Sequence, residues 1–339
     1  MVKNHFLKYN ILVTFERNFF YRAKKLMRKV LVTDGVHPLL LEGLEALGFQ
    51  CDYHPKIGLE RVREMVADYE GIIINSKVLM DKAMLDAAIK LEFIGRLGSG
   101  MEIIDLGYAA QKGIVVHGAP EGNCNAVAEH ALGMLLALAN NFLRADQEVR
   151  KKNWQREKNR GFEIMGNTIG IIGFGHTGSQ FAKKLSGMGV EILAYDKYKT
   201  DYTNNFEQVR ETTLEDILAN ADIISLHLPF TPETKHLVNS DFLKKCRDGV
   251  ILINTSRGHV AKTRDLIVGL KSGKVGGACL DVFENEKIAT FSKEEHEMYD
   301  ELYDFDNVIM TPHVAGWTKE SLQRLAEVLL RKITKGLKI

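Results

Sequence analysis

The stretch Asn167-Thr-Ile-Gly-Ile-Ile-Gly-Phe-Gly-His-Thr-Gly178 decides the fold of this 339-residue chain. It predicts a buried strand over residues 168–172, a turn with three spaced glycines, and a helix over residues 179–188. A second predicted strand, residues 190–195, ends at Asp196, about 20 residues beyond the turn. This order of strand, glycine turn, helix, strand and acid is the context that a dinucleotide-binding fingerprint requires.

Each fingerprint position has a physical reason. Gly173 permits the tight turn, Gly175 lets the backbone approach a pyrophosphate, and Gly178 lets the helix lie close to the sheet. The helix N-terminus offers unpaired N–H groups and the positive end of its dipole to the phosphates. Asp196 can accept hydrogen bonds from both ribose hydroxyls and would repel a 2′-phosphate. The sequence therefore predicts NAD as the cofactor in preference to NADP. The alternative, a glycine turn that serves only steric packing, does not explain the acid at position 196.

Composition indicates an ordinary globular chain, with 45% apolar residues, 26% charged residues and a net charge of +1. The length allows two domains that each bury a core. The charge gives no reason to expect nucleic acid or an anionic membrane as a partner, and no apolar run approaches the ~20 residues that span a bilayer. Four cysteines are scattered without a CxxC pair. They predict reduced thiols in a cytoplasmic protein and no metal site.

Predicted strands and helices alternate from residue 28 onward, which indicates parallel sheets with crossover helices. We expect an α/β protein with two Rossmann-like, doubly wound parallel-sheet domains. One long helix over residues 126–150 should connect them, and a last helix over 321–333 should return to the first domain. The substrate domain is then discontinuous, residues 27–125 plus 315–339, and the NAD-binding domain is 126–314. Residues 1–26 are interpreted as a non-native or disordered extension before a start at Met27, with a basic targeting segment as the alternative.

Polar side chains follow four predicted strands of the second domain, where open α/β sheets bind ligands. These strand ends bring an arginine, acids and a histidine to one edge: residues 227–229, 254–258, 281–286 and 311–313. A histidine can take the hydroxyl proton as hydride leaves and return it in reverse. A carboxylate would orient the imidazole and raise its pKa, and a guanidinium can hold a substrate carboxylate through two bonds. Each residue alone also fits a structural role, but together they favour hydride chemistry.

Several separated motifs then point to a family. They are residues 127–130, 225–234, 251–260, 270–274, 277–283 and 311–313. In this order they resemble the signature of the D-isomer-specific 2-hydroxyacid dehydrogenases, and the resemblance covers about residues 28–335. It implies a catalytic Arg257, an orienting Glu286 and an acid/base His313. It also implies two α/β domains closing over a crevice, a small-molecule 2-hydroxy or 2-oxo acid as substrate, and a homodimer built largely through the nucleotide domain.

The resemblance further implies two sets of binding residues. Those for NAD lie in the fingerprint and at the strand ends: Gly173, Gly175, His176, Thr177, Gly178, Asp196, Leu228, Thr255, Ser256, Asp281 and Gly316. Those for the substrate lie in the first domain: Asn75, Ser76, Arg96, Ser99 and Gly100. Among the latter, Arg96 would meet the anion of the substrate.

Within the family, the loops at 94–100 and 122–129 are most similar to those of members that act on D-3-phosphoglycerate. We therefore expect interconversion of D-3-phosphoglycerate and 3-phosphohydroxypyruvate, the reaction of serine biosynthesis, in a short form without a regulatory domain. Four positions depart from that pattern. An arginine is usual at Asn75, an Asp-Asn pair at 102–103, an acid at Lys262 and a proline at Lys287. A hydroxypyruvate or glyoxylate reductase, or another D-2-hydroxyacid dehydrogenase, is the alternative.

A function of another class is an NAD-sensing corepressor-like binding protein, since this fold also serves such proteins. A corepressor should present a peptide-binding cleft and flanking interaction tails, and the sequence shows no long tails. A formate dehydrogenase of similar fold would need a glutamine partner for the histidine, where this chain has Glu286. The sequence therefore favours an enzyme of the 2-hydroxyacid class.

Overall fold

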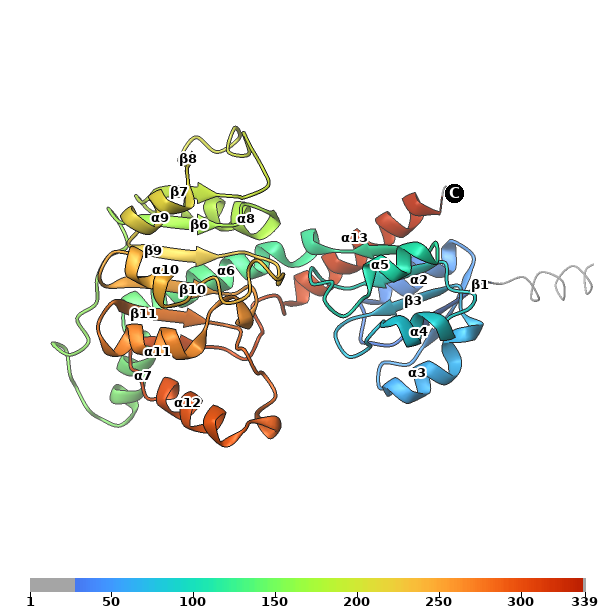
Figure 1. The fold of residues 1–339 in the computed structure, drawn as a ribbon, viewed down its shortest axis with the longest axis horizontal. Helices are drawn as coiled ribbons and strands as arrows, with labels where there is room; N and C mark the ends of the chain where they lie inside the picture. Colours follow the sequence, from blue (N-terminus) through green and yellow to red (C-terminus); the bar gives the residue numbers. More distant parts are fainter. Residues whose placement is uncertain (1–27, 338–339) are drawn as a thin grey trace, which may run out of the picture. The chain divides into compact units, whose positions relative to one another are not determined.

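The structure is a computed structural model that describes residues 28–337, so the extension predicted over residues 1–26 lies outside the described part. The described chain forms two compact units, residues 28–122 with 322–337 (unit 1) and residues 123–321 (unit 2). The chain passes from one unit to the other within helices α6 (Pro120–Ala139) and α13 (Lys319–Gly336). Each unit is built on its own sheet (Figure 1).

Unit 1 contains a five-stranded sheet with the order β2-β1-β3-β4-β5. Its strands are β1 (Arg28–Val32), β2 (Phe49–Tyr53), β3 (Gly71–Ile74), β4 (Phe93–Arg96) and β5 (Val115–Gly118). Its helices, besides most of α13, are α2 (Pro38–Ala46), α3 (Leu59–Met65) with the 3₁₀ turn η1 (Val66–Asp68), α4 (Lys82–Ala87) and α5 (Leu106–Gln111). Every strand pair is parallel.

Unit 2 contains a seven-stranded sheet with the order β12-β11-β10-β9-β6-β7-β8. Its strands are β6 (Thr168–Ile172), β7 (Glu191–Tyr195), β8 (Val209–Glu211), β9 (Ile223–Leu226), β10 (Val250–Asn254), β11 (Val275–Leu280) and β12 (Val308–Met310). Besides most of α6, its helices are α7 (Phe142–Arg150), α8 (His176–Leu185), α9 (Leu214–Asn220), α10 (Ser240–Lys245), α11 (Thr263–Lys271) and α12 (Lys293–Tyr303), with 3₁₀ turns η2 (Gly258–Val260) and η3 (Ile288–Thr290).

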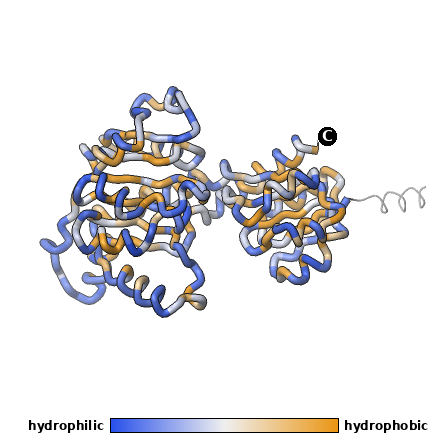
Figure 2. Tube along the Cα trace, viewed as in Figure 1, coloured by the Kyte–Doolittle hydropathy of each residue, from blue (hydrophilic) through white to orange (hydrophobic). Residues whose placement is uncertain are grey.

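The two strand orders are those of doubly wound sheets. All pairs in unit 2 are parallel, and β6 lies between β7 and β9, so the order reverses at β6. Strands buried on both faces read as continuous apolar runs, as in β3 (GIII) and β10 (VILIN). Figure 2 shows this apolar colouring along the strands of each unit. The predicted fold class is confirmed.

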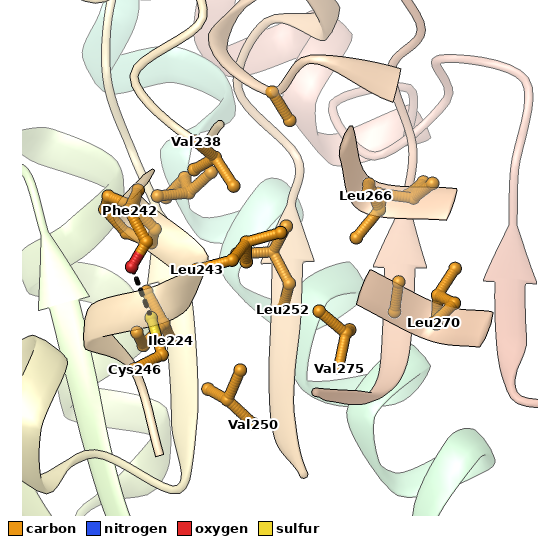
Figure 3. Close-up of a cluster of buried hydrophobic side chains, with 14 of the residues drawn as sticks. Ile224, Val238, Phe242, Leu243, Cys246, Val250, Leu252, Leu266, Leu270 and Val275 are labelled. Atoms are coloured by element: carbon orange, nitrogen blue, oxygen red, sulfur yellow. Dashed lines mark hydrogen bonds between the residues drawn. The ribbon is translucent and has the colours of Figure 1, made fainter. Parts of the chain in front are cut away.

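Helices cover both faces of each sheet. In unit 2, α6 and α8 pack on one face, and α9, α10, α11 and α12 pack on the other. Figure 3 shows the second core, in which Phe242 and Leu243 of α10 lie against Ile224 and Leu252 of the sheet. In unit 1, one core includes α3, α4 and α5, and the other includes α2 and Leu325 to Ile333 of α13. The C-terminal helix thus completes the first sheet's second layer.

The single helix predicted over residues 126–150 is wrong. The chain bends by 60° between α6 and α7, and Asn141 at the break has a left-handed backbone with φ 53°. Asparagine tolerates that conformation better than most residues, so the pair Asn140-Asn141 ends one helix and starts another. No single helix among residues 28–337 is long and apolar enough to cross a membrane, and only the bent pair α6–α7 reaches that composition when taken together.

Candidate active site

The fingerprint glycines lie at the carboxyl end of β6, next to β9, where the strand order reverses. Gly173 has φ 92°, and a Cβ there would lie 2.4 Å from the carbonyl oxygen of His227. A Cβ on Gly178 would lie 2.1 Å from the carbonyl oxygen of Gly173. A Cβ on Gly175 would meet no atom of the described residues within 4 Å. The protein's own packing therefore requires the first and third glycines, whereas the second borders open space.

Helix α8 begins three residues earlier than the sequence predicts, at His176, with Gly175 as its N-cap. The third glycine is thus a helical residue, and His176 and Thr177 form the first turn. No side chain of the described residues caps this end, so the backbone N–H groups of that turn face the space beside Gly175. An uncapped N-terminus next to an open glycine is what a phosphate group requires.

Asp196 follows β7 and lies beside the glycine turn. One carboxylate oxygen accepts the backbone N–H of Phe174 at 3.0 Å, and the other accepts that of Tyr198 at 3.1 Å. The ammonium of Lys199 is 3.7 Å away, and it also donates to the carbonyl of Phe174 at 2.8 Å. The acid is therefore held against the turn by backbone contacts, with a lysine close by.

His313 and Glu286 form a pair near the carboxyl edge of the same sheet. Nδ1 of His313 lies 2.8 Å from Oε2 of Glu286, and both side chains are partly exposed. The hydrogen bond to Glu286 raises the pKa of His313, while burial and the nearby positive charge of Arg257 oppose that rise. Burial would raise the pKa of Glu286, but the hydrogen bond and charge of His313 bring it below its usual value. The geometry therefore favours an imidazolium–carboxylate pair.

Asp281 positions the loop that carries His313. Its buried carboxylate accepts the hydroxyl of Thr311 at 2.6 Å and the backbone N–H groups of Val314 and Ala315, each at 2.9 Å. Its carbonyl accepts the N–H of His313 at 2.8 Å. These bonds fix His313 in a left-handed conformation, φ 54°. Such strained backbone persists where the surroundings determine it fully, so Asp281 acts here as a positioning residue.

His130 of α6 extends this network and was not assigned a role from the sequence. Its Nε2 lies 2.9 Å from the hydroxyl of Thr311 and 3.7 Å from the carboxylate of Asp281. A partly buried histidine on an apolar helix is the signal that could have marked it. The helix α6 is thereby connected to the loop of His313.

The Arg257 segment is fixed by Asn254 at the end of β10. The side-chain oxygen of Asn254 accepts the N–H and hydroxyl of Ser256 at 3.1 and 2.8 Å, and its Nδ2 donates to the carbonyl of Arg257 at 3.0 Å. A Cβ on Gly258 would lie 1.9 Å from the carbonyl oxygen of Phe283, so the loop lies directly on the next one. This packing sets Arg257 close enough to affect the pKa values of both His313 and Glu286.

Three other predicted cofactor residues, Leu228, Thr255 and Gly316, follow strands β9, β10 and β12. A Cβ on Gly173 would lie 3.1 Å from Leu228, so Leu228 borders the turn from β9. The hydroxyl oxygen of Thr255 is buried and has no hydrogen-bond partner among residues 28–337, which fits a group that awaits a ligand. Gly316 packs closely against Asn123: a Cβ on Gly316 would lie 2.7 Å from Nδ2 of Asn123. These residues fit a dinucleotide that runs from the α8 terminus along the strand ends.

In unit 1, the predicted substrate residues gather at the ends of β3 and β4. Arg96 donates from Nη1 to Oδ1 of Asn75 at 2.9 Å and from Nε to the carbonyl of Gly100 at 3.0 Å. Ser76 and Ser99 are exposed on the flanking loops. Asn75 thus helps to orient Arg96, and the guanidinium lies at the carboxyl edge of the unit 1 sheet.

Comparison with known proteins supplies the family. A family model described as the D-isomer specific 2-hydroxyacid dehydrogenase, NAD binding domain, matches residues 132–315. The chain belongs to this family. Residues 132–315 are its NAD-binding domain, so NAD is the cofactor that this domain serves.

Individual relatives carry more than one activity in their names. The chain is 33% identical over 314 residues to a D-3-phosphoglycerate dehydrogenase of Archaeoglobus fulgidus, covering 92% of this chain and 58% of that protein. It is 34% identical over 280 residues to a hydroxypyruvate reductase of Thermotoga maritima, covering 83% and 89%. The fold is similar to that of a D-lactate dehydrogenase from Aquifex aeolicus complexed with NAD and lactic acid, with a TM-score of 0.80, 31% identity and coverage of 91% and 95%. The chain spans little more than half the length of the Archaeoglobus relative.

Proposed function

We propose that this chain is an NAD-dependent oxidoreductase that interconverts a D-2-hydroxy acid and its 2-oxo acid. The observation that carries the proposal is the His313–Glu286 pair, 2.8 Å apart, with the charge of Arg257 acting on both. A bound NADH supplies the hydride in the direction of reduction. The chain's residues then have to bind the oxo acid, polarise its carbonyl and deliver a proton to the oxygen.

Each role follows from the chemistry of the residue. The imidazolium of His313, stabilised by Glu286, donates its proton to the carbonyl oxygen as the hydride arrives, and in oxidation it accepts that proton back. The guanidinium of Arg257 can bind the carboxylate of the acid through two hydrogen bonds. The N–H groups of the first α8 turn, Gly175 and Asp196 hold the dinucleotide.

For the substrate, we propose D-3-phosphoglycerate and 3-phosphohydroxypyruvate, as in serine biosynthesis. Support comes from relatives named D-3-phosphoglycerate dehydrogenase at 31–35% identity, and from Arg96, whose guanidinium is oriented by Asn75 and Gly100 toward an anion-binding role. Hydroxypyruvate is the second candidate, because the Thermotoga relative is matched over most of its own length. Hydroxypyruvate is also favoured by Asn75. An arginine at this position would add a second cation for the substrate phosphate, and hydroxypyruvate carries no phosphate.

A substrate panel separates these candidates. The rate of NADH oxidation is measured with 3-phosphohydroxypyruvate, hydroxypyruvate, glyoxylate and pyruvate at equal enzyme concentration. The proposal predicts the highest kcat/KM for 3-phosphohydroxypyruvate, with the preference reduced in Arg96→Gln. A higher value for hydroxypyruvate would replace the substrate assignment, and no turnover of any oxo acid together with tight NADH binding would favour the NAD-sensing class.

We also propose a homodimer in the cytoplasm. Most apolar residues of α6 pack against the sheet of unit 2, so this helix offers little apolar surface for an interface. Helix α7, in contrast, has no buried residue and exposes Phe142, Leu143 and Val149, and Trp154 beyond it is 76% exposed. A second copy would cover these side chains. Sedimentation should show a dimer at micromolar concentration, and a fully active monomer would refute the interface.

A further inference from the structure

A group of three metal-ligating side chains lies in unit 2, outside the residues assigned above. The ligand atoms of His236, His259 and Glu284 lie within 4.8 Å of one another. His236 follows β9, His259 lies in η2, and Glu284 follows β11. Nε2 of His236 is 2.6 Å from Oε1 of Glu284. We call this group the histidine–glutamate cluster.

Backbone contacts hold the cluster in place. The N–H of His236 donates to the carbonyl of His259 at 2.7 Å, which ties the two histidine segments together directly. Two more backbone bonds continue this pairing, from Val238 to Val260 at 3.0 Å and from Lys262 to Val238 at 2.8 Å. His236 itself has φ 52°, a conformation that such surroundings must impose. The two imidazoles are therefore brought together by the fold.

The carboxylate is fixed independently. Oε2 of Glu284 accepts the backbone N–H of Thr263 at 2.8 Å, at the start of α11. Gly258, next to His259, packs so closely that a Cβ there would lie 2.6 Å from the N of Glu284. One carboxylate oxygen is thus committed to the backbone, and the other faces the imidazole of His236. Metal-binding carboxylates are commonly oriented by such an outer hydrogen bond.

We propose that the histidine–glutamate cluster binds a divalent transition-metal ion, with Zn²⁺ as the best fit. Two imidazole nitrogens and one carboxylate oxygen are ligands that Zn²⁺ accepts at about 2.0–2.2 Å, with a fourth position left for water. Tetrahedral geometry at that distance separates neighbouring ligand atoms by roughly 3.3 Å. His236 and Glu284, now 2.6 Å apart, must therefore separate slightly. His259 is exposed and can adjust by rotation. Hard ions such as Mg²⁺ prefer oxygen ligands and fit less well.

A simple ion pair between His236 and Glu284 is the competing explanation. It accounts for the 2.6 Å contact, and the ring of His259 then only packs against Phe230, with ring centroids 5.3 Å apart. The site is separate from the proposed acid/base pair, because Glu284 bonds to His236 whereas Glu286 bonds to His313. The role of His259 therefore distinguishes a metal site from an ion pair, without reference to catalysis.

The test uses the full chain, freed of metal by a chelator that is then removed. Zn²⁺ is titrated by calorimetry and Co²⁺ by visible absorption, and thermal unfolding is recorded with and without Zn²⁺. Variants are His259→Ala, which removes an exposed ligand, and Glu284→Gln, which keeps an acceptor for Thr263. His296→Ala, an exposed histidine on α12, is the matched control.

We expect one Zn²⁺ per chain and a rise of several degrees in Tm at saturating Zn²⁺. The visible absorption of bound Co²⁺ should be that of an ion with four or five ligands. His259→Ala and Glu284→Gln should each weaken binding by at least about 100-fold, since loss of a mere supporting hydrogen bond costs about 10–100-fold. His296→Ala should bind as the wild type does, and each variant should retain its metal-free Tm within a few degrees. Absence of one-site binding in the wild type, or unchanged affinity in His259→Ala, would overturn the proposal.

Discussion

The carboxylate of Glu286 offers a quantitative test of the acid/base pair. Replacing it by glutamine keeps a side chain of the same shape, with an oxygen that can still accept from Nδ1 of His313 at the observed 2.8 Å. What is lost is the negative charge. Because the pKa of His313 is raised chiefly by this hydrogen bond, the Glu286→Gln variant should bring that pKa down.

The magnitude follows from the contact and its exposure. A hydrogen bond with a charged partner contributes about 1.5–3 kcal/mol. The side chains of His313 and Glu286 are 50% and 39% exposed, so solvent screening reduces this by about half. The free energy lost with the charge is then about 0.75–1.5 kcal/mol, and its loss lowers the pKa of His313.

The sign is fixed by the direction of the reaction. Reduction of an oxo acid requires protonated His313, so kcat/KM falls as the pH rises through its pKa. In Glu286→Gln this high-pH limb should move to lower pH, because the imidazolium loses its charged partner. The assay is kcat/KM for 3-phosphohydroxypyruvate against pH at saturating NADH, with Glu297→Gln, an exposed carboxylate on α12, as the control. A limb that stays in place, or moves to higher pH, would refute the pairing.

Three further predictions concern the cofactor and the substrate carboxylate. Gly175→Ala should keep the Tm of the wild type but weaken NADH binding. Gly178→Ala, whose Cβ would lie 2.1 Å from a backbone oxygen, should instead lose about 1–3 kcal/mol of stability, partly offset by about 1 kcal/mol of helix propensity. The opposite pattern in thermal melting and NADH titration would contradict the roles assigned to the two glycines. Asp196→Ala should weaken NAD binding about 10-fold. It should also reduce the preference for NAD over NADP, because Lys199, whose ammonium lies 3.7 Å from the Asp196 carboxylate, remains to bind a 2′-phosphate. Equal kcat/KM for NAD and NADP in the wild type would contradict the assignment of NAD as the cofactor. Arg257→Lys should lower kcat/KM for the oxo acid while NADH affinity is kept, since an ammonium does not reproduce a two-bond contact, and unchanged kcat/KM would remove Arg257 from substrate binding.

Strong local patterns made most of the sheet predictable from the sequence. The apolar runs of β3 and β10 are bounded by turn residues, and the fingerprint predicted β6, the first strand of the unit 2 sheet along the chain. The boundary of α8 was less predictable. The third glycine was taken as part of the turn, whereas the helix already includes Gly178 because it packs there on the turn's own backbone.

Three helices that are short or mostly polar were not predicted. Helices α5 and α10 have only six residues each, too few to show a helical period, and α12 is mostly polar, although the caps of all three were visible in the sequence. Ser292 and Glu295 form a capping box at the start of α12, and Asp105 and Asn239 cap α5 and α10. The bend before α7 depended on one asparagine that adopts a left-handed backbone, which tertiary packing decides.

In the candidate site, too, the sequence predicted what depends on strand ends but not what depends on tertiary packing. Strand ends placed Arg257, Glu286 and His313 in one region, because parallel strands share a carboxyl edge. The support from His130 and Thr311 was not predicted, since it depends on how α6 packs against a loop 181 residues away in sequence. The histidine–glutamate cluster likewise requires three segments to pack together, so the spacing of His236, His259 and Glu284 in the sequence does not predict it.

The role of His313 as the proton donor can be measured in the variant His313→Gln. The rate of NADH oxidation is recorded at saturating NADH and oxo acid, and NADH affinity is determined by fluorescence on the same sample. We expect unchanged NADH affinity and a rate at least ~10²-fold below that of the wild type, the usual scale for loss of a general acid. Near-normal turnover of every tested oxo acid in His313→Gln would show that the proton comes from elsewhere and would contradict the proposed site.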